Sequence, residues 1–122
     1  SEAFIDHVTD SVQKKIVHIT SFLGSSTLNT KKASGDFAGG MYAYRTSKTA
    51  VNILTRSMAA DLEDRGVTVL AFHPGWVKTD MGGPDAQVDA KDSVTGIRTI
   101  ISSATIADTG SLKTFDGDIL PP

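Results

Sequence analysis

The sequence lacks cysteine altogether. Without cysteine the chain can form no disulfide bond and can use no thiolate as a nucleophile or a metal ligand. The three histidines, at positions 7, 18 and 73, do not have the spacing of a local metal-binding motif. We therefore expect neither thiol chemistry nor a metal site in this protein.

A strong charge of either sign and a long apolar run are also missing. The 12 basic and 14 acidic residues give a net charge of −2, which predicts no basic surface for nucleic acid or an anionic membrane. No apolar run approaches the ~20 residues that span a bilayer. The first residues lack the charged-then-apolar order of a signal peptide. We expect a cytoplasmic protein that binds neither nucleic acid nor membrane.

Apolar residues recur at helical spacing in some segments and form short β-branched runs in others, while residues 112–115 alternate before an Asp-Gly turn. The pattern predicts helices over 2–13, 41–65 and 89–104, with Asp89 as a cap, and strands over 15–20, 67–72 and 112–115. The polar, aperiodic segment 24–40 is predicted to be a surface loop. Because a helix joins the first two strands, we expect those strands to be parallel, as in α/β proteins.

The longest predicted helix, 41–65, contains neither glycine nor proline. One side carries residues at three- and four-residue steps: Tyr44, Lys48, Val51, Thr55, Met58 and Leu62. Further apolar or small residues lie elsewhere around it: Ala50, Ile53, Leu54 and Ala60. A one-sided surface helix does not need so many, so a second face can pack against a partner subunit.

The candidate functional residues follow the predicted strands. Tyr44 and Lys48 lie one helical turn apart, so both side chains can face one bound ligand. Ser21 comes directly after the first strand, and Pro74 and Gly75 follow the second. Because ligands of open α/β sheets bind outside the carboxyl ends of the strands, we expect these residues to converge on one edge.

Each candidate also has an ordinary structural interpretation. The tyrosine–lysine pair can be a surface pair on an amphipathic helix, and Ser21 can cap a turn. Pro74 can simply end a strand, and Thr79 can cap the next turn. Tyr42 is a rival phenol, but the fourth residue after it is Thr46, so no lysine supports it.

The run 39–48, together with 73–83, resembles the C-terminal part of a short-chain dehydrogenase/reductase, especially the sniffer and C-factor-like carbonyl reductases. The resemblance covers nearly the whole chain. It implies an α/β fold with a Rossmann-like doubly wound parallel sheet, of which residues 1–122 would supply about three strands and three helices. It also implies that the partner of this chain is a second copy packed through the 41–65 helix, or else the missing N-terminal half.

The resemblance implies a role for each candidate residue. Ser21 is similar to the family's substrate-orienting serine, Tyr44 to its proton donor or acceptor, and Lys48 to its ribose-binding lysine. The residues expected to contact the cofactor are Tyr44, Lys48, Pro74, Gly75, Val77 and Thr79. The implied reaction is hydride transfer between NADP or NAD, with NADP slightly favoured, and a small-molecule carbonyl or alcohol substrate.

Elementary chemistry independently supports these roles. A neighbouring cation stabilises a phenolate, and Lys48 can be that cation for Tyr44. Its ammonium has three donors, enough to hold ribose hydroxyls at the same time. Ser21 can hydrogen-bond the carbonyl oxygen on which negative charge develops during reduction.

Parts of the family pattern are missing from the chain. The Gly-rich turn that binds the dinucleotide pyrophosphate does not occur, and the family's helix-borne asparagine would precede Ser1. The interval between Ser21 and Tyr44 is longer than usual in the family, and we expect 29–36 to form a surface excursion near the substrate mouth. Residues 1–122 are therefore expected to be the C-terminal part of a single NAD(P)-binding domain, inactive without its N-terminal half.

Two alternatives stay open at this point. An incomplete domain of this kind could serve as a dimerisation or regulatory module without catalysis. A sugar-nucleotide epimerase or dehydratase would share the tyrosine and lysine on a similar fold, but the short tail after the last strand leaves little room for a sugar-nucleotide domain.

Overall fold

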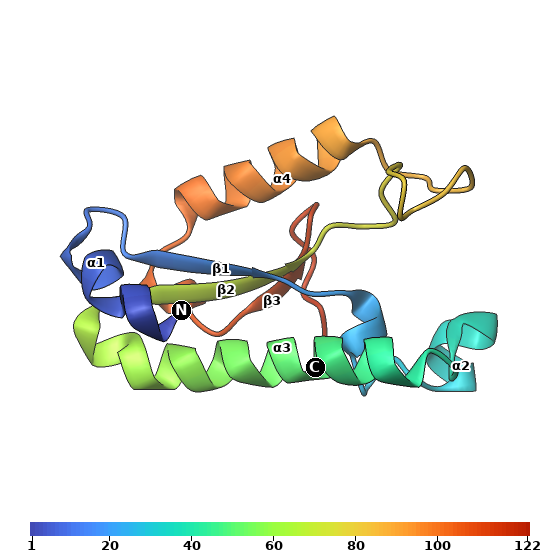
Figure 1. The fold of residues 1–122 in the computed structure, drawn as a ribbon, viewed down its shortest axis with the longest axis horizontal. Coiled ribbons are helices and arrows are strands. Elements are labelled where there is room, and N and C mark those ends of the chain that lie inside the picture. Colours follow the sequence, from blue (N-terminus) through green and yellow to red (C-terminus); the bar gives the residue numbers. More distant parts are fainter.

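The computed structural model describes residues 1–122 as a sheet with helices on both faces (Figure 1). The three strands are β1 (Lys15–Ile19), β2 (Thr68–His73) and β3 (Leu112–Thr114), all parallel and in the order β1-β2-β3. The long helix α3 (Tyr42–Leu62) covers one face and α4 (Ala90–Ser103) the other, while α1 (Ile5–Asp10) and α2 (Lys31–Ser34) are short. The predicted doubly wound, Rossmann-like α/β arrangement is confirmed, with one helix more than expected.

The central strand β2 is the most buried segment of the chain. It pairs with β1 and β3 on its two sides, and helices cover both of its faces. Val69 packs against Ala59 and Leu62 of α3, whereas Leu70 packs against Ile97 of α4. Successive side chains of a strand point to opposite faces, so a strand buried on both sides reads as a continuous apolar run.

Helix α3 buries the predicted side chains Thr55 and Leu62, and adds Arg45, Asn52 and Ala59. Its other face stays uncovered within the chain. Ile53 is 64% exposed and Leu54 47% exposed, which is unusual for apolar side chains in the middle of a long helix. None of the helices combines the length and the apolar character that a bilayer crossing requires.

The predicted helix 2–13 is wrong at its C-terminal end. The chain forms a 3₁₀ turn and then α1, which ends at Asp10. The Ser11 hydroxyl donates to the Val8 carbonyl at 2.7 Å and so competes with the helical backbone bonds. Val12, which lies within the predicted helix but beyond the end of α1, is fully exposed.

The prediction of a loop throughout 24–40 is also wrong, because the segment contains α2 and a 3₁₀ turn, Gly35–Phe37. Thr30 starts α2, and its hydroxyl accepts a hydrogen bond from the Ala33 amide at 3.2 Å. A threonine in this position is a standard helix N-cap. The signal was present in the sequence but was masked by the lack of apolar periodicity.

Helix α4 begins at the predicted residue but is not capped as expected. Asp89 occupies the N-cap position, yet its carboxylate pairs with Lys78 at 3.0 Å instead of accepting a backbone amide. Within α4, Ile97 is buried against the sheet, as is Ala104 directly after the helix, whereas Val94 is 55% exposed.

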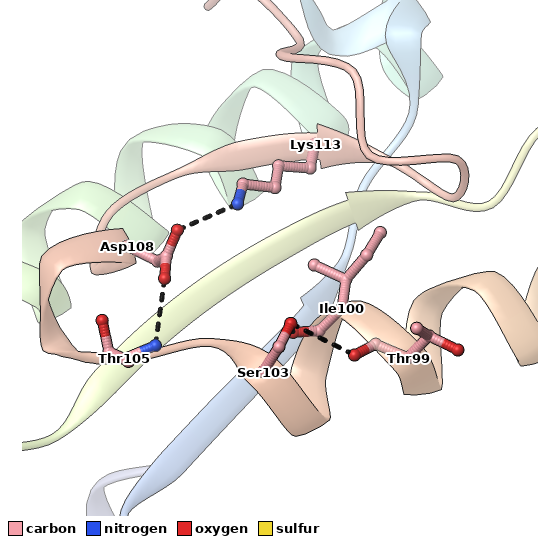
Figure 2. A network of polar contacts seen from close by, with 6 residues as sticks. All are labelled: Thr99, Ile100, Ser103, Thr105, Asp108 and Lys113. Atoms are coloured by element: carbon pink, nitrogen blue, oxygen red, sulfur yellow. Dashed lines mark hydrogen bonds and ion pairs between the residues drawn. The ribbon is translucent and has the colours of Figure 1, made fainter.

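The end of α4 is joined to β3 by the polar network in Figure 2. Thr105 and Asp108 form a capping box around a 3₁₀ turn, in which the Thr105 amide donates to Asp108 Oδ2 at 3.0 Å. Lys113 of β3 donates to Asp108 Oδ1, also at 3.0 Å. The Thr105 amide first, and then Lys113, hold the pKa of Asp108 below its ordinary value of 3.8.

Replacing Asp108 by asparagine is expected to lower the free energy of unfolding by about 1 kcal/mol at neutral pH, because the neutral amide loses the charge that accepts from Lys113 and the Thr105 amide. Because the folded-state pKa of Asp108 is depressed, its stabilisation is present above 3.8 and is lost as the pH falls through the folded-state value. Urea unfolding at neutral and acidic pH measures this, with Asp85→Asn, at an exposed carboxylate, as control. If the difference in the free energy of unfolding between wild type and Asp108→Asn did not shrink at acidic pH, the stabilising role of the Asp108 carboxylate would be wrong.

Candidate active site

The structure brings Tyr44 and Lys48 together at the start of α3. The Lys48 ammonium lies 5.7 Å from the centroid of the Tyr44 ring, within the range of a cation–π contact. The same ammonium donates to the carbonyl oxygen of Ile19 at 3.2 Å, and Ile19 is the last residue of β1. Lys48 therefore links the start of α3 to the carboxyl end of the sheet, while Tyr44 stays 38% exposed.

Ser21 lies against this part of α3. It is buried at 6% exposure and begins a 3₁₀ turn, η2 (Phe22–Gly24), where its hydroxyl oxygen accepts from the Leu23 amide at 3.2 Å. A Cβ on Gly24 would come within 2.7 Å of the Lys48 carbonyl carbon, so only glycine lets η2 approach α3 so closely. The Ser21 hydroxyl both caps this turn, as its structural interpretation predicts, and keeps its own proton available.

A buried polar pair that sequence reasoning missed fastens η2 and β1 to α3. The Thr20 hydroxyl donates to Asn52 Oδ1, and Asn52 Nδ2 donates to the Gly24 carbonyl at 3.1 Å. Thr20 is 2% exposed and Asn52 4%. The available signal was a polar residue on the inward stripe of α3, since buried polar groups need a partner.

Pro74 and Gly75 lie at the same edge of the sheet. Ile19 of β1 is paired with Phe72 of β2, so the residues that follow the two strands emerge side by side. The Pro74 carbonyl accepts from the buried Ser93 hydroxyl of α4 at 2.6 Å. Gly75 has φ +84°, and a Cβ there would come within 3.0 Å of neighbouring side chains, so this turn requires glycine.

The loop that follows β2 is held by its own hydrogen bonds and projects beyond the sheet (Figure 1). Val77 forms a β-bridge with Val88. The Thr79 hydroxyl oxygen accepts from the Gly82 amide at 3.1 Å, and Trp76 Nε1 donates to the Gly82 carbonyl at 2.7 Å. Thr79 thus caps a turn, as the structural alternative for this residue predicted. A contact between Thr79 and a cofactor stays a proposal.

The two histidines near the sheet contact neighbouring side chains. Burial lowers the pKa of His18 and of His73, so both rings are neutral around pH 7. His18 Nδ1 lies 2.9 Å from the Thr55 hydroxyl, and the His73 ring packs 5.4 Å from that of Phe22. No three His, Asp or Glu side chains come together as a possible metal-binding group.

Comparison with known proteins identifies relatives of this chain. Residues 1–90 match the family described as short chain dehydrogenase. C-signal from Myxococcus xanthus is 38% identical over 121 residues, an alignment that covers 99% of this chain and 69% of C-signal.

Two solved structures resemble the fold closely. The carbonyl reductase Sniffer of D. melanogaster superposes with a TM-score of 0.79 at 41% identity, covering 88% of this chain and 41% of that one. The NADPH-bound carbonyl reductase from chicken fatty liver superposes with a TM-score of 0.85 at 30% identity, covering 100% of this chain and 51% of that one. The resemblance to sniffer and C-factor-like proteins is confirmed, and the chain spans about half the length of these solved relatives.

Proposed function

Because the chain belongs to the short-chain dehydrogenase family, we propose that the full-length protein transfers hydride between NAD(P)(H) and a small carbonyl or alcohol substrate. The observation that carries the proposal is the Tyr44–Lys48 pair, held at the carboxyl end of β1 beside the segment of Ser21. In open α/β sheets this edge is where ligands bind.

The residues present fit the nicotinamide–ribose half of such a cofactor. The Lys48 ammonium has three donors and uses one on Ile19, so two remain for ribose hydroxyls. Pro74, Gly75, Val77 and Thr79 emerge from β2 at the same edge and are proposed to contact the nicotinamide end. When bound, the cofactor supplies or accepts the hydride. Likeness to an NADPH-bound reductase favours NADP over NAD.

Residues of the chain itself carry out the proton transfer. In reduction, the Tyr44 hydroxyl gives its proton to the substrate oxygen, and in oxidation the Tyr44 phenolate takes that proton back. The positive charge of Lys48 stabilises the phenolate in both directions. The Ser21 hydroxyl only accepts a hydrogen bond within the chain, so its own hydrogen can be donated to the same substrate oxygen while negative charge develops there.

We also propose that residues 1–122 are the C-terminal part of one NAD(P)-binding domain, with the Gly-rich half elsewhere in the full-length protein. β1 is an edge strand with Ile19 half exposed, and an unpaired edge of this kind accepts a further strand. The uncovered face of α3, with Ile53 and Leu54, supports a homodimer through that helix. A non-catalytic dimerisation module would bind its partner through the same face of α3. The cytoplasmic location stays a prediction.

Titration of NADPH and then NADH, followed by nicotinamide fluorescence, tests the proposal. The full-length protein is expected to bind saturably, with NADPH the tighter ligand, and the 122-residue chain is expected not to bind, because no Gly-rich pyrophosphate turn occurs in it. Intact mass on each sample identifies the species titrated. Absence of binding to the full-length protein would overturn the enzyme proposal and favour the dimerisation module.

A further inference from the structure

Arg45, the residue after Tyr44, is a buried cation without an acidic partner. It is 8% exposed, although arginine is rarely buried unless its charge is paired. The ion pairs of the structure involve other side chains, and none reaches Arg45. Such a group needs another source of compensation, and its contacts show what that source is.

The guanidinium is surrounded by backbone carbonyl oxygens. Its Nε donates to the carbonyls of Gly39 and Gly40, each at 3.1 Å. One terminal nitrogen donates to Leu23 of η2 at 3.3 Å, and the other donates to Phe37. The planar fork of arginine can serve several acceptors at once, whereas a lysine ammonium cannot reproduce that geometry. One side chain thus joins η2, the 3₁₀ turn Gly35–Phe37 and the approach to α3.

The backbone around the two glycines that accept from Arg45 adopts an unusual conformation. Gly39, Gly40 and Met41 have φ angles of +76°, +62° and +47°, three left-handed residues in succession. Methionine rarely adopts this conformation, and Met41, in the N-cap position before α3, makes no side-chain cap. Such a conformation persists only where surrounding contacts hold it, and the guanidinium supplies two of them at the adjacent glycines.

The loop held by Arg45 places an exposed aromatic ring against the residue that follows Ser21. Phe37 is 63% exposed, and its ring packs edge-on against Phe22 with centroids 6.2 Å apart. Phe22 is the residue after Ser21. Figure 1 shows this part of the chain, around α2, at the amino end of α3, which is the end that carries Tyr44.

We propose that Arg45 is a positioning residue that fixes the loop 35–41, so that Phe37 forms an apolar wall of the substrate site beside Ser21 and Tyr44. The substrate class that fits such a wall is a carbonyl compound with an aromatic or bulky apolar substituent. This inference rests on the proposed function, because it names the substrate group that the same site would accept.

The structural half of the test does not depend on activity. Hydrogen exchange of the amides of 35–41 and η2 is compared in full-length wild type, Arg45→Lys and Arg45→Met. Both variants are expected to exchange at least about tenfold faster there, with β2 unchanged, since carbonyls lose their donors. Arg56→Met is the matched control, because Arg56 is an exposed arginine on the same helix. Arg45→Lys carries the test if Arg45→Met does not fold.

The kinetic half compares an aryl ketone with a small aliphatic ketone. In Arg45→Lys the KM for the aryl ketone is expected to rise about tenfold, with kcat and the cofactor Kd changed by less than about threefold. Phe37→Ala is expected to reproduce this change. Unchanged exchange, a fall in kcat at constant KM, or equal KM effects on both ketones would overturn the inference. A wild type that reduces neither ketone would overturn the proposed function, and exchange would still decide whether Arg45 holds the loop.

Discussion

Replacing Tyr44 by phenylalanine is expected to lower the turnover of the full-length protein by roughly 10²- to 10⁴-fold, the usual contribution of a positioned general acid or base. The substitution removes only the hydroxyl that gives or takes the proton. The ring stays in place beneath the Lys48 ammonium, 5.7 Å away, so the cation contact is kept. Because Lys48 is untouched, the cofactor Kd is expected to change by less than about twofold.

Tyr42→Phe is the matched control for this experiment. Tyr42 precedes Tyr44 by two residues on the same helix and is 82% exposed, with no lysine one turn away. Its turnover is expected to stay within about twofold of wild type. Steady-state kinetics of the two variants, with cofactor binding measured by fluorescence, gives the comparison. Undiminished turnover in Tyr44→Phe would refute the role of this phenol.

Replacing Lys48 by alanine is expected to weaken both turnover and cofactor binding. Lys48 is placed to bridge Ile19, Tyr44 and the proposed ribose, so its loss removes the cation that stabilises the phenolate as well as donors to the cofactor. A hydrogen bond from a charged group contributes about 1.5–3 kcal/mol, which corresponds to a rise in the cofactor Kd of roughly 10- to 150-fold. This combined loss distinguishes Lys48 from Tyr44, whose removal spares binding.

Lys91→Ala provides the control, because Lys91 is an exposed lysine on α4. Lys48→Arg is expected to keep the positive charge but recover little turnover, since the planar guanidinium cannot take the place of a compact ammonium. Titration calorimetry and steady-state rates measure the two effects. If Lys48→Ala bound the cofactor as tightly as wild type, the ribose contact proposed for this residue would be wrong.

The sequence was a good guide wherever a local period governs the structure. The spacing of Tyr44 and Lys48 predicted that they share a helix face. The β-branched runs predicted β1 and β2, and the alternation in 112–115 predicted β3, each to within one residue at either end. The convergence of Ser21 and Pro74 on one edge followed from the parallel connection of β1 and β2. These inferences depend on contacts between residues near in sequence or on the topology of the sheet.

Predictions failed where a single polar side chain decides the local path. Ser11 ends α1 early, and Thr30 starts α2 within an aperiodic segment. The role of Arg45 could not be predicted at all, because its acceptors belong to backbone of η2 and 37–40, whose course depends on the fold. Amphipathic periodicity identifies which side of a helix is buried, but it cannot say which carbonyls will meet a buried guanidinium.

In the proposed reaction, a carbonyl substrate at this edge of the sheet receives a hydride from the cofactor and a proton from Tyr44. The most direct test follows deuterium from NADPH labelled at both positions of nicotinamide C4, using mass spectrometry of the alcohol formed by the full-length protein. We expect the deuterium on the carbinol carbon with wild type and Tyr42→Phe, and only trace product with Tyr44→Phe. Absence of labelled alcohol from wild type, or equal labelling by Tyr44→Phe, would contradict the account.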